Sequence, residues 1–208
     1  VLGAIVLGAA AYEMGNLLGA VAGFQLIFDL PPFVLVLIIG VAAAILLNIP
    51  SLKIISTIMG IVVVLMGIGF LVTAILVQPS FSEIVKGALV PKIPASPQGG
   101  ILVLGLIGTT IVPYNLFLGS GISNKNQSVK EMRFGLVIAI VLGGIFSMAV
   151  LIVGTSVLAE FSFHELSIAL QQKIGPSGKY LLGFGLFAAG FTSSVTAPLA
   201  AAITLKSL

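Results

Sequence analysis

The chain has 208 residues, of which 59% are hydrophobic and only 7% charged, and its mean hydropathy is +1.28. Soluble domains carry about 25% charged residues because water must solvate their surface, so this composition excludes an ordinary soluble domain. The net charge of +3 is small and dispersed, which gives no basis for expecting nucleic acid as a partner. The absence of cysteine excludes disulfides and thiolate metal sites.

Apolar segments follow one another along the chain. Six are predicted, at 1–28, 33–47, 54–77, 99–122, 134–158 and 180–205. The long stretches of the chain that contain no charged residue are close to or longer than the roughly 20 residues that a helix needs to cross a bilayer. Strands of a membrane barrel have about 10 residues and alternate strictly, unlike these solidly apolar runs. The sequence therefore predicts an all-α, multi-pass integral membrane protein, with the lipid bilayer as its solvent.

The ends and loops of the chain suggest its organisation. Both ends fall within or just after apolar runs, and the first residue is Val1, so we expect a single transmembrane domain, 1–208, truncated at both ends. Short loops at Lys53, 123–133 and Lys206 carry five basic residues, against four in the other two loops. The positive-inside rule predicts that the first set is cytoplasmic, and the cell membrane is the expected location.

An acid interrupts the first apolar segment. Glu13 lies near its middle, and Asn16 follows on the same helical face. An ionised acid at mid-bilayer costs about 2.5–3.5 kcal/mol on insertion scales. Two interpretations remain open, a helix contact sealed by a Glu–Asn hydrogen bond or a relay for protons or cations. Gly15, Gly19 and Gly23 recur at every fourth position, which predicts close approach of a neighbouring helix.

The fourth segment contains a proline within Gly-Thr-Thr-Ile-Val-Pro-Tyr-Asn, residues 108–115. Pro113 lacks an N–H and clashes with a carbonyl one turn earlier, which frees backbone groups near Thr109 and Thr110. A kink healed by the Thr hydroxyls is one interpretation. The other is an interrupted helix at the midplane, whose freed carbonyls coordinate a cation beside Asn115.

The last segment carries a hydroxyl-rich turn before Pro198. Thr192, Ser193 and Thr196 either bond back to carbonyls of their own helix or line a second candidate cation site. The sequence alone leaves both open.

Residues 108–120 resemble the sixth transmembrane helix of the natural resistance-associated macrophage protein (Nramp) family of divalent metal transporters. The family carries Gly-Ala-Thr-Val-Met-Pro-His-Asn-Leu-Tyr-Leu-His-Ser there, and this chain has Gly-Thr-Thr-Ile-Val-Pro-Tyr-Asn-Leu-Phe-Leu-Gly-Ser. Residues 188–194 look like the family's eighth helix, and 13–31 are similar to its third. The resemblance implies helices three to eight of a LeuT-like inverted repeat, with the fourth helix of this chain interrupted near Pro113.

Departures from the family pattern point to a hard ion. Val112 stands where the family has a Met ligand, and Thr109 stands where an Ala carbonyl binds the metal. A thioether suits softer metals, whereas oxygen donors and water suit Mg²⁺ or Mn²⁺, and the pattern resembles the Nramp-related magnesium transporter branch. Tyr114 replaces a family His. Glu13 matches an acid of the proton pathway, but Asn16 replaces a second acid, which leaves proton coupling open.

The expected function is alternating-access transport of a divalent cation of the Mg²⁺, Mn²⁺ or Fe²⁺ class, with hard ions favoured. The metal position would comprise Thr109, Thr110 and Val112, and the proton or ion pathway would comprise Glu13, Asn16, Tyr114 and Asn115. The alternatives are a LeuT-like sodium-coupled amino-acid carrier and a non-transporting membrane scaffold. An enzyme is disfavoured because no cluster of His, Cys or paired acids supplies a nucleophile and base, and no cofactor is expected besides the transported ion.

Overall fold

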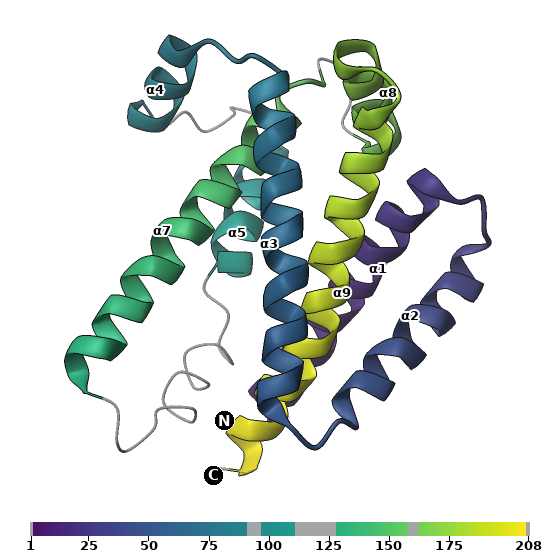
Figure 1. The fold of residues 1–208 in the computed structure, drawn as a ribbon, viewed down its shortest axis with the longest axis vertical. Coiled ribbons are helices and arrows are strands. Elements are labelled where there is room, and N and C mark those ends of the chain that lie inside the picture. The colour runs from purple at the N-terminus through teal and green to yellow at the C-terminus, as the bar shows by residue number, and fades with distance from the viewer. Residues whose placement is uncertain (1, 91–96, 111–127, 158–161, 207–208) are drawn as a thin grey trace.

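The structure is a computed structural model that describes residues 2–90, 97–110, 128–157 and 162–206. Within these ranges all regular structure is helical, which confirms the predicted all-α class (Figure 1). The helices are α1 (Leu2–Ile27), α2 (Pro32–Leu47), α3 (Leu52–Leu76), α4 (Phe81–Leu89), α5 (Pro97–Thr110), α7 (Val129–Gly154), α8 (Phe163–Ile174) and α9 (Ser177–Lys206).

Each of the six predicted segments overlaps a helix, the fourth only over its described part, 99–110, but the helices differ in whether they can cross a membrane alone. Three of them, α3, α7 and α9, are long and apolar enough by themselves. Helices α1 and α2 meet the same criteria only as a pair, which is bent by 119° at the turn between them, so the described residues contain three or four candidate spans. Helix α5 is shorter within the described residues. The chain is thus an integral, multi-pass membrane protein.

Serine caps explain where several helices begin. Ser51 precedes α3 and accepts from the Ile54 N–H. Ser128 and Glu131 form a reciprocal capping box at the start of α7, which satisfies two backbone donors that a helix leaves unpaired. Ser162 caps α8 by accepting from the Glu165 N–H. The polar stretches at 80–98 and 159–179, expected as connections, therefore contain the short helices α4 and α8.

Helix α9 lies at the centre and packs against α1, α2, α3 and α8, while α7 packs against α3 (Figure 1). The contact face of α9 consists largely of Gly, Ala, Ser and Thr, which lets the backbones of neighbouring helices approach. The largest buried cluster joins α3, α7, α8 and α9 through Phe70, Ala74, Val77, Ala149, Val153, Leu166, Leu170 and Leu182. Most of α7 is exposed and apolar, as expected of a surface that faces lipid.

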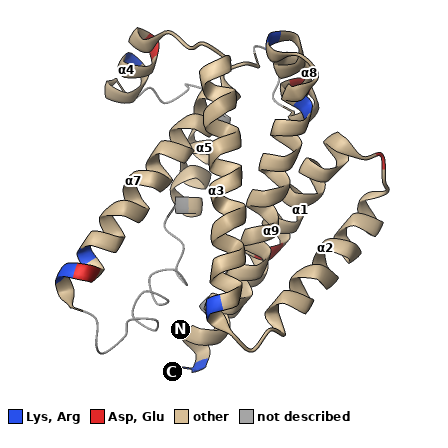
Figure 2. Cartoon of the chain, in the orientation of Figure 1, with Lys and Arg blue, Asp and Glu red and all other residues tan. Residues whose placement is uncertain are grey.

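Apart from Glu13 within α1, the described charged residues gather toward the two ends of the bundle (Figure 2). The starts of α3 and α7 and the end of α9 lie at one end of the bundle, and α4 and α8 lie at the other (Figure 1). Connections that the predicted topology places on opposite sides of the membrane therefore lie at opposite ends of the bundle.

Candidate functional site

The candidate site begins with a backbone contact between α1 and α9. A Cβ atom at Gly190 would collide with the backbone nitrogen of Ala20 and the carbonyl oxygen of Asn16. Two turns earlier on α9, a Cβ at Gly183 would lie 2.8 Å from the carbonyl oxygen of Gly23. The two helices therefore touch without intervening side chains, which only glycine permits at these positions.

The glycine repeat of α1 predicted this contact only in part. Gly23 meets α9, whereas a Cβ at Gly15 or Gly19 would have no atom within 4 Å. The contact runs instead along the face that holds Asn16, Ala20 and Gly23, because the glycines of α9 determine where the partner can approach.

A polar cluster lies beside the contact. The Asn16 amide and the Ser194 hydroxyl lie beside the Glu13 carboxylate. Ser194 is only 1% exposed. Ser194 follows Gly190 by four residues and therefore shares its helical face. Sequence reasoning missed Ser194 because its neighbours are also hydroxyl residues and only the packing of α9 selects among them.

The cluster is packed but its hydrogen bonds are not complete. Glu13 Oε2, Asn16 Nδ2 and Ser194 Oγ are buried and have no hydrogen-bond partner among the described residues. Unpaired buried polar atoms are rare in native proteins, and each costs about 1–3 kcal/mol. No hydrogen bond reaches Glu13 Oε2 or Asn16 Nδ2 from the described residues, and both interpretations of the pair, helix contact and relay, stay predictions. A carboxylate, an amide and a hydroxyl together can hold a proton, a water molecule or a hydrated cation.

A tyrosine connects this turn of α1 to α5. The Tyr12 hydroxyl donates to the carbonyl oxygen of Gly108 at 2.5 Å. The next residue is Thr109, whose hydroxyl donates to the carbonyl of Leu106 at 3.0 Å. The structure therefore brings the acid-bearing turn of α1 to the last described turn of α5, where the sequence predicts the metal position. Tyr12 was not singled out from the sequence, although it adjoins Glu13.

The predicted helix interruption cannot be followed further. Thr110 ends α5, and Val112, Pro113, Tyr114 and Asn115 lie outside the described residues. The metal position therefore remains a prediction.

Two of the three α9 hydroxyls that were predicted as a second cation site donate to carbonyls of their own helix. Thr192 Oγ1 donates to the Ala188 carbonyl at 2.8 Å, and Thr196 Oγ1 donates to the Thr192 carbonyl at 3.0 Å. Ser193 is partly buried. Helix α9 continues through Pro198 to Lys206. Each Thr hydroxyl keeps its acceptor lone pairs, so the second site also stays a prediction.

No group of three His, Asp or Glu side chains that could hold a metal occurs in the part of the chain that the structure describes. A metal site there would depend on backbone carbonyls, hydroxyls and amides, the donor set that the sequence predicts for a hard ion.

Comparison with known proteins gives a consistent result. The family model for natural resistance-associated macrophage protein-like (Nramp) proteins matches residues 1–208. The chain is 24% identical over 213 residues to the divalent metal cation transporter MntH of Yersinia pestis (strain Pestoides F), covering 94% of this chain and 51% of that protein. It is 25% identical over 213 residues to MntH of Vibrio campbellii (strain ATCC BAA-1116), covering 95% and 50%. The chain spans about half the length of these curated relatives.

Proposed function

Because the chain belongs to the Nramp family, we propose that the protein transports a divalent metal cation across the cell membrane by alternating access. Membership confirms the resemblance noted in residues 108–120, and with it the LeuT-like fold. The similar proteins of Yersinia pestis and Vibrio campbellii are named as divalent metal cation transporters. The metal is the cargo in this proposal, and neither catalysis nor a resident cofactor is part of it.

The observation that carries the proposal is the buried polar cluster between α1 and α9. Glu13, Asn16 and Ser194 present polar atoms without partners inside a membrane helix pair, where an ionisable group is expensive and marks ion or proton pathways. The hydrogen bond from Tyr12 to Gly108 connects the cluster to the end of α5. In the proposal, a proton or a hydrated ion that follows this route binds to the unpaired polar atoms one after another.

The metal position is proposed just beyond the Tyr12 contact. The Thr109 hydroxyl or carbonyl, Thr110 and the backbone at Val112 would offer oxygen ligands after the helix is interrupted at Pro113. Val112 has no side-chain donor, so the site would favour hard ions such as Mg²⁺ and Mn²⁺ over softer ones. Tyr114 and Asn115 would line the same route. Thr192, Ser193 and Thr196 are proposed as a second cation site.

Glu13 is the group in the α1–α9 cluster that can exchange a proton, because the Asn16 amide does not ionise. We propose that any coupling to protons passes through this carboxylate. Glu13→Gln would then abolish the dependence of metal uptake on a proton gradient while leaving the metal position intact.

The test is metal uptake by liposomes that contain the intact protein. Thr109→Leu places an apolar side chain at the proposed ligand position and should reduce uptake of Mg²⁺ and Mn²⁺ strongly. Val112→Met adds a thioether and should raise uptake of Cd²⁺ relative to Mg²⁺. Glu165→Gln, a change of an exposed acid in the first turn of α8, is the matched control for Glu13→Gln. Unchanged uptake and selectivity in the Thr109 and Val112 variants would reject the metal position. Sodium-dependent amino-acid uptake without metal uptake would reject the function.

A further inference from the structure

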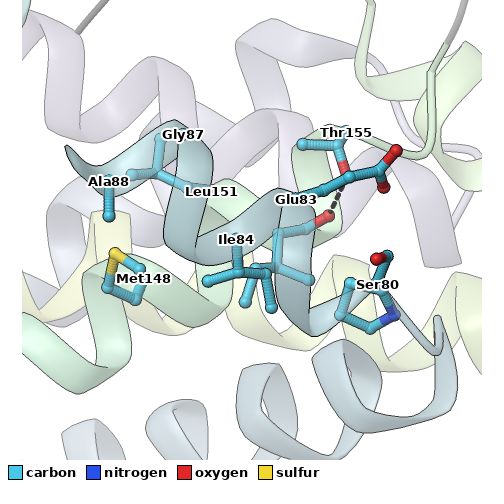
Figure 3. Close-up of a pocket in the computed structure, with 10 residues that line it drawn as sticks. Ser80, Glu83, Ile84, Gly87, Ala88, Met148, Leu151 and Thr155 are labelled. Atoms are coloured by element: carbon cyan, nitrogen blue, oxygen red, sulfur yellow. Dashed lines mark hydrogen bonds between the residues drawn. The ribbon is translucent and has the colours of Figure 1, made fainter. Parts of the chain in front are cut away.

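A hollow made of parts that share lining residues extends from the short helix α4 to the crevice between α3 and α7. One part, of about 310 Å³, lies between α4 and α7 (Figure 3). It shares Pro79, Ile84, Met148 and Ile152 with a larger part of about 670 Å³ between α3 and α7. A third part of about 400 Å³, which Lys86 and Val90 also line, shares Glu83 and Gly87 with the first.

The hollow is polar at one end and apolar at the other. In Figure 3, Ser80, Glu83 and Thr155 lie together at one end of the α4–α7 part, and Met148 and Ala88 lie at the opposite end. The larger part between α3 and α7 is lined almost entirely by apolar residues and contains no charged side chain among its described lining. An amphipathic occupant, with a polar head and a long apolar tail, matches this gradient.

The polar end carries one acid and one base. Glu83 and Lys86 border the same hollow, both are exposed, and neither forms an ion pair with another described residue. One negative and one positive group complement a ligand that itself carries one ammonium and one phosphate. A purely anionic ligand would leave Glu83 facing a like charge.

The surroundings of the hollow indicate that its occupant comes from the bilayer. Helix α4 lies beside the ends of α3 and α7, away from the middle of the bundle (Figure 1). Two of its large apolar side chains are strongly exposed, Phe81 at 79% and Leu89 at 75%. A short helix with charged residues and exposed apolar residues is suited to the membrane–water interface, where phospholipid headgroups lie.

We propose that this hollow binds one phospholipid with a zwitterionic, primary-amine headgroup. Glu83 accepts hydrogen bonds from the ammonium group, Lys86 pairs with the phosphate, and an acyl chain occupies the crevice between α3 and α7. The site is separate from the α1–α9 cluster, and the inference does not depend on metal transport.

The experiment is native mass spectrometry of the detergent-purified protein with phosphatidylethanolamine and with phosphatidylcholine of the same acyl chains. Wild-type protein should retain phosphatidylethanolamine in preference, because the trimethylammonium group of phosphatidylcholine has no N–H to donate. Glu83→Gln should lower this retention by about fivefold, the upper end of the range for an exposed charge pair. Equal retention of both lipids by the wild type would overturn the proposal, as would tighter retention of anionic phosphatidylglycerol.

A second variant tests occupancy of the hollow independently of charge. Gly87 borders the hollow, and a Cβ there would meet no atom within 4 Å, so Gly87→Leu fits the fold while filling the space. It should abolish retention of phosphatidylethanolamine with an unchanged Tm. Gly60→Leu is the matched control, because Gly60 of α3 is equally open and does not border the hollow. Retention by the Gly87 variant equal to that of the Gly60 variant would refute the site.

Discussion

The backbones of α1 and α9 meet at Gly190, and replacing this glycine with alanine should separate them. The new Cβ would overlap the backbone nitrogen of Ala20 and the carbonyl oxygen of Asn16, and would lie 2.8 Å from Ala20 Cα. All three are backbone atoms, so no side-chain rotation can relieve the clash and one helix must move. Overpacking a close contact costs about 1–3 kcal/mol, and an immovable neighbour places this substitution near the upper end, at about 2–3 kcal/mol.

The assay is thermal unfolding of the purified protein together with metal uptake by liposomes. For a domain of this size, about 2–3 kcal/mol corresponds to a decrease in Tm of about 4–12 °C. Movement of α9 would also carry Ser194 away from Glu13, so uptake should fall as well. Gly15→Ala is the control on α1, since a Cβ there meets no atom within 4 Å and alanine is the better helix former by about 0.8–1.0 kcal/mol. A Gly190→Ala protein as stable as the Gly15→Ala protein would refute the assigned helix contact.

Two further substitutions separate the stability of the site from its activity. Ser194→Ala removes a buried hydroxyl that has no partner among the described residues. The Tm should therefore be unchanged or raised, by the equivalent of about 1 kcal/mol, while metal uptake falls. A large loss of Tm would show that the hydroxyl is structurally paired. Tyr12→Phe removes the hydrogen bond to the Gly108 carbonyl and should lower stability by about 0.5–1.5 kcal/mol and reduce uptake, whereas Tyr180→Phe, at an exposed tyrosine of α9, should do neither. Equal uptake by the two Tyr variants would argue against a role for the α1–α5 connection.

The positions of the long helices could be predicted from hydropathy because a helix satisfies all backbone hydrogen bonds of a segment that lies in lipid. What hydropathy could not predict is which segments cross the membrane alone. Helix α2 has 16 residues, and α1 carries polar side chains, so they meet the requirements only as a bent pair. The short helices α4 and α8 were missed for a related reason, since polar, interfacial helices have no long apolar run to reveal them.

The candidate site shows the same division between local and tertiary information. Glu13 and Asn16 could be singled out because polar groups stand out in an apolar helix, and their spacing places them on one face. Ser194 could not be chosen over Thr192, because both are hydroxyl residues of one turn and only the position of Gly190 on α9 determines which faces α1. The Thr192 hydroxyl is satisfied by its own helix, and that of Ser194 is not.

The energetic cost of the α1–α9 cluster favours transport over a structural role. A membrane scaffold gains nothing from a carboxylate at this place, since inserting an ionised acid at the centre of a membrane helix costs about 2.5–3.5 kcal/mol. A structural Glu would be expected to recover part of that cost through complete hydrogen bonding, yet Glu13 Oε2, Asn16 Nδ2 and Ser194 Oγ have no partners among the described residues. The close glycine contact beside them holds the helices together without their help. Polar atoms that are costly, buried and not needed for packing are suited to a ligand that comes and goes, which is what a carrier requires.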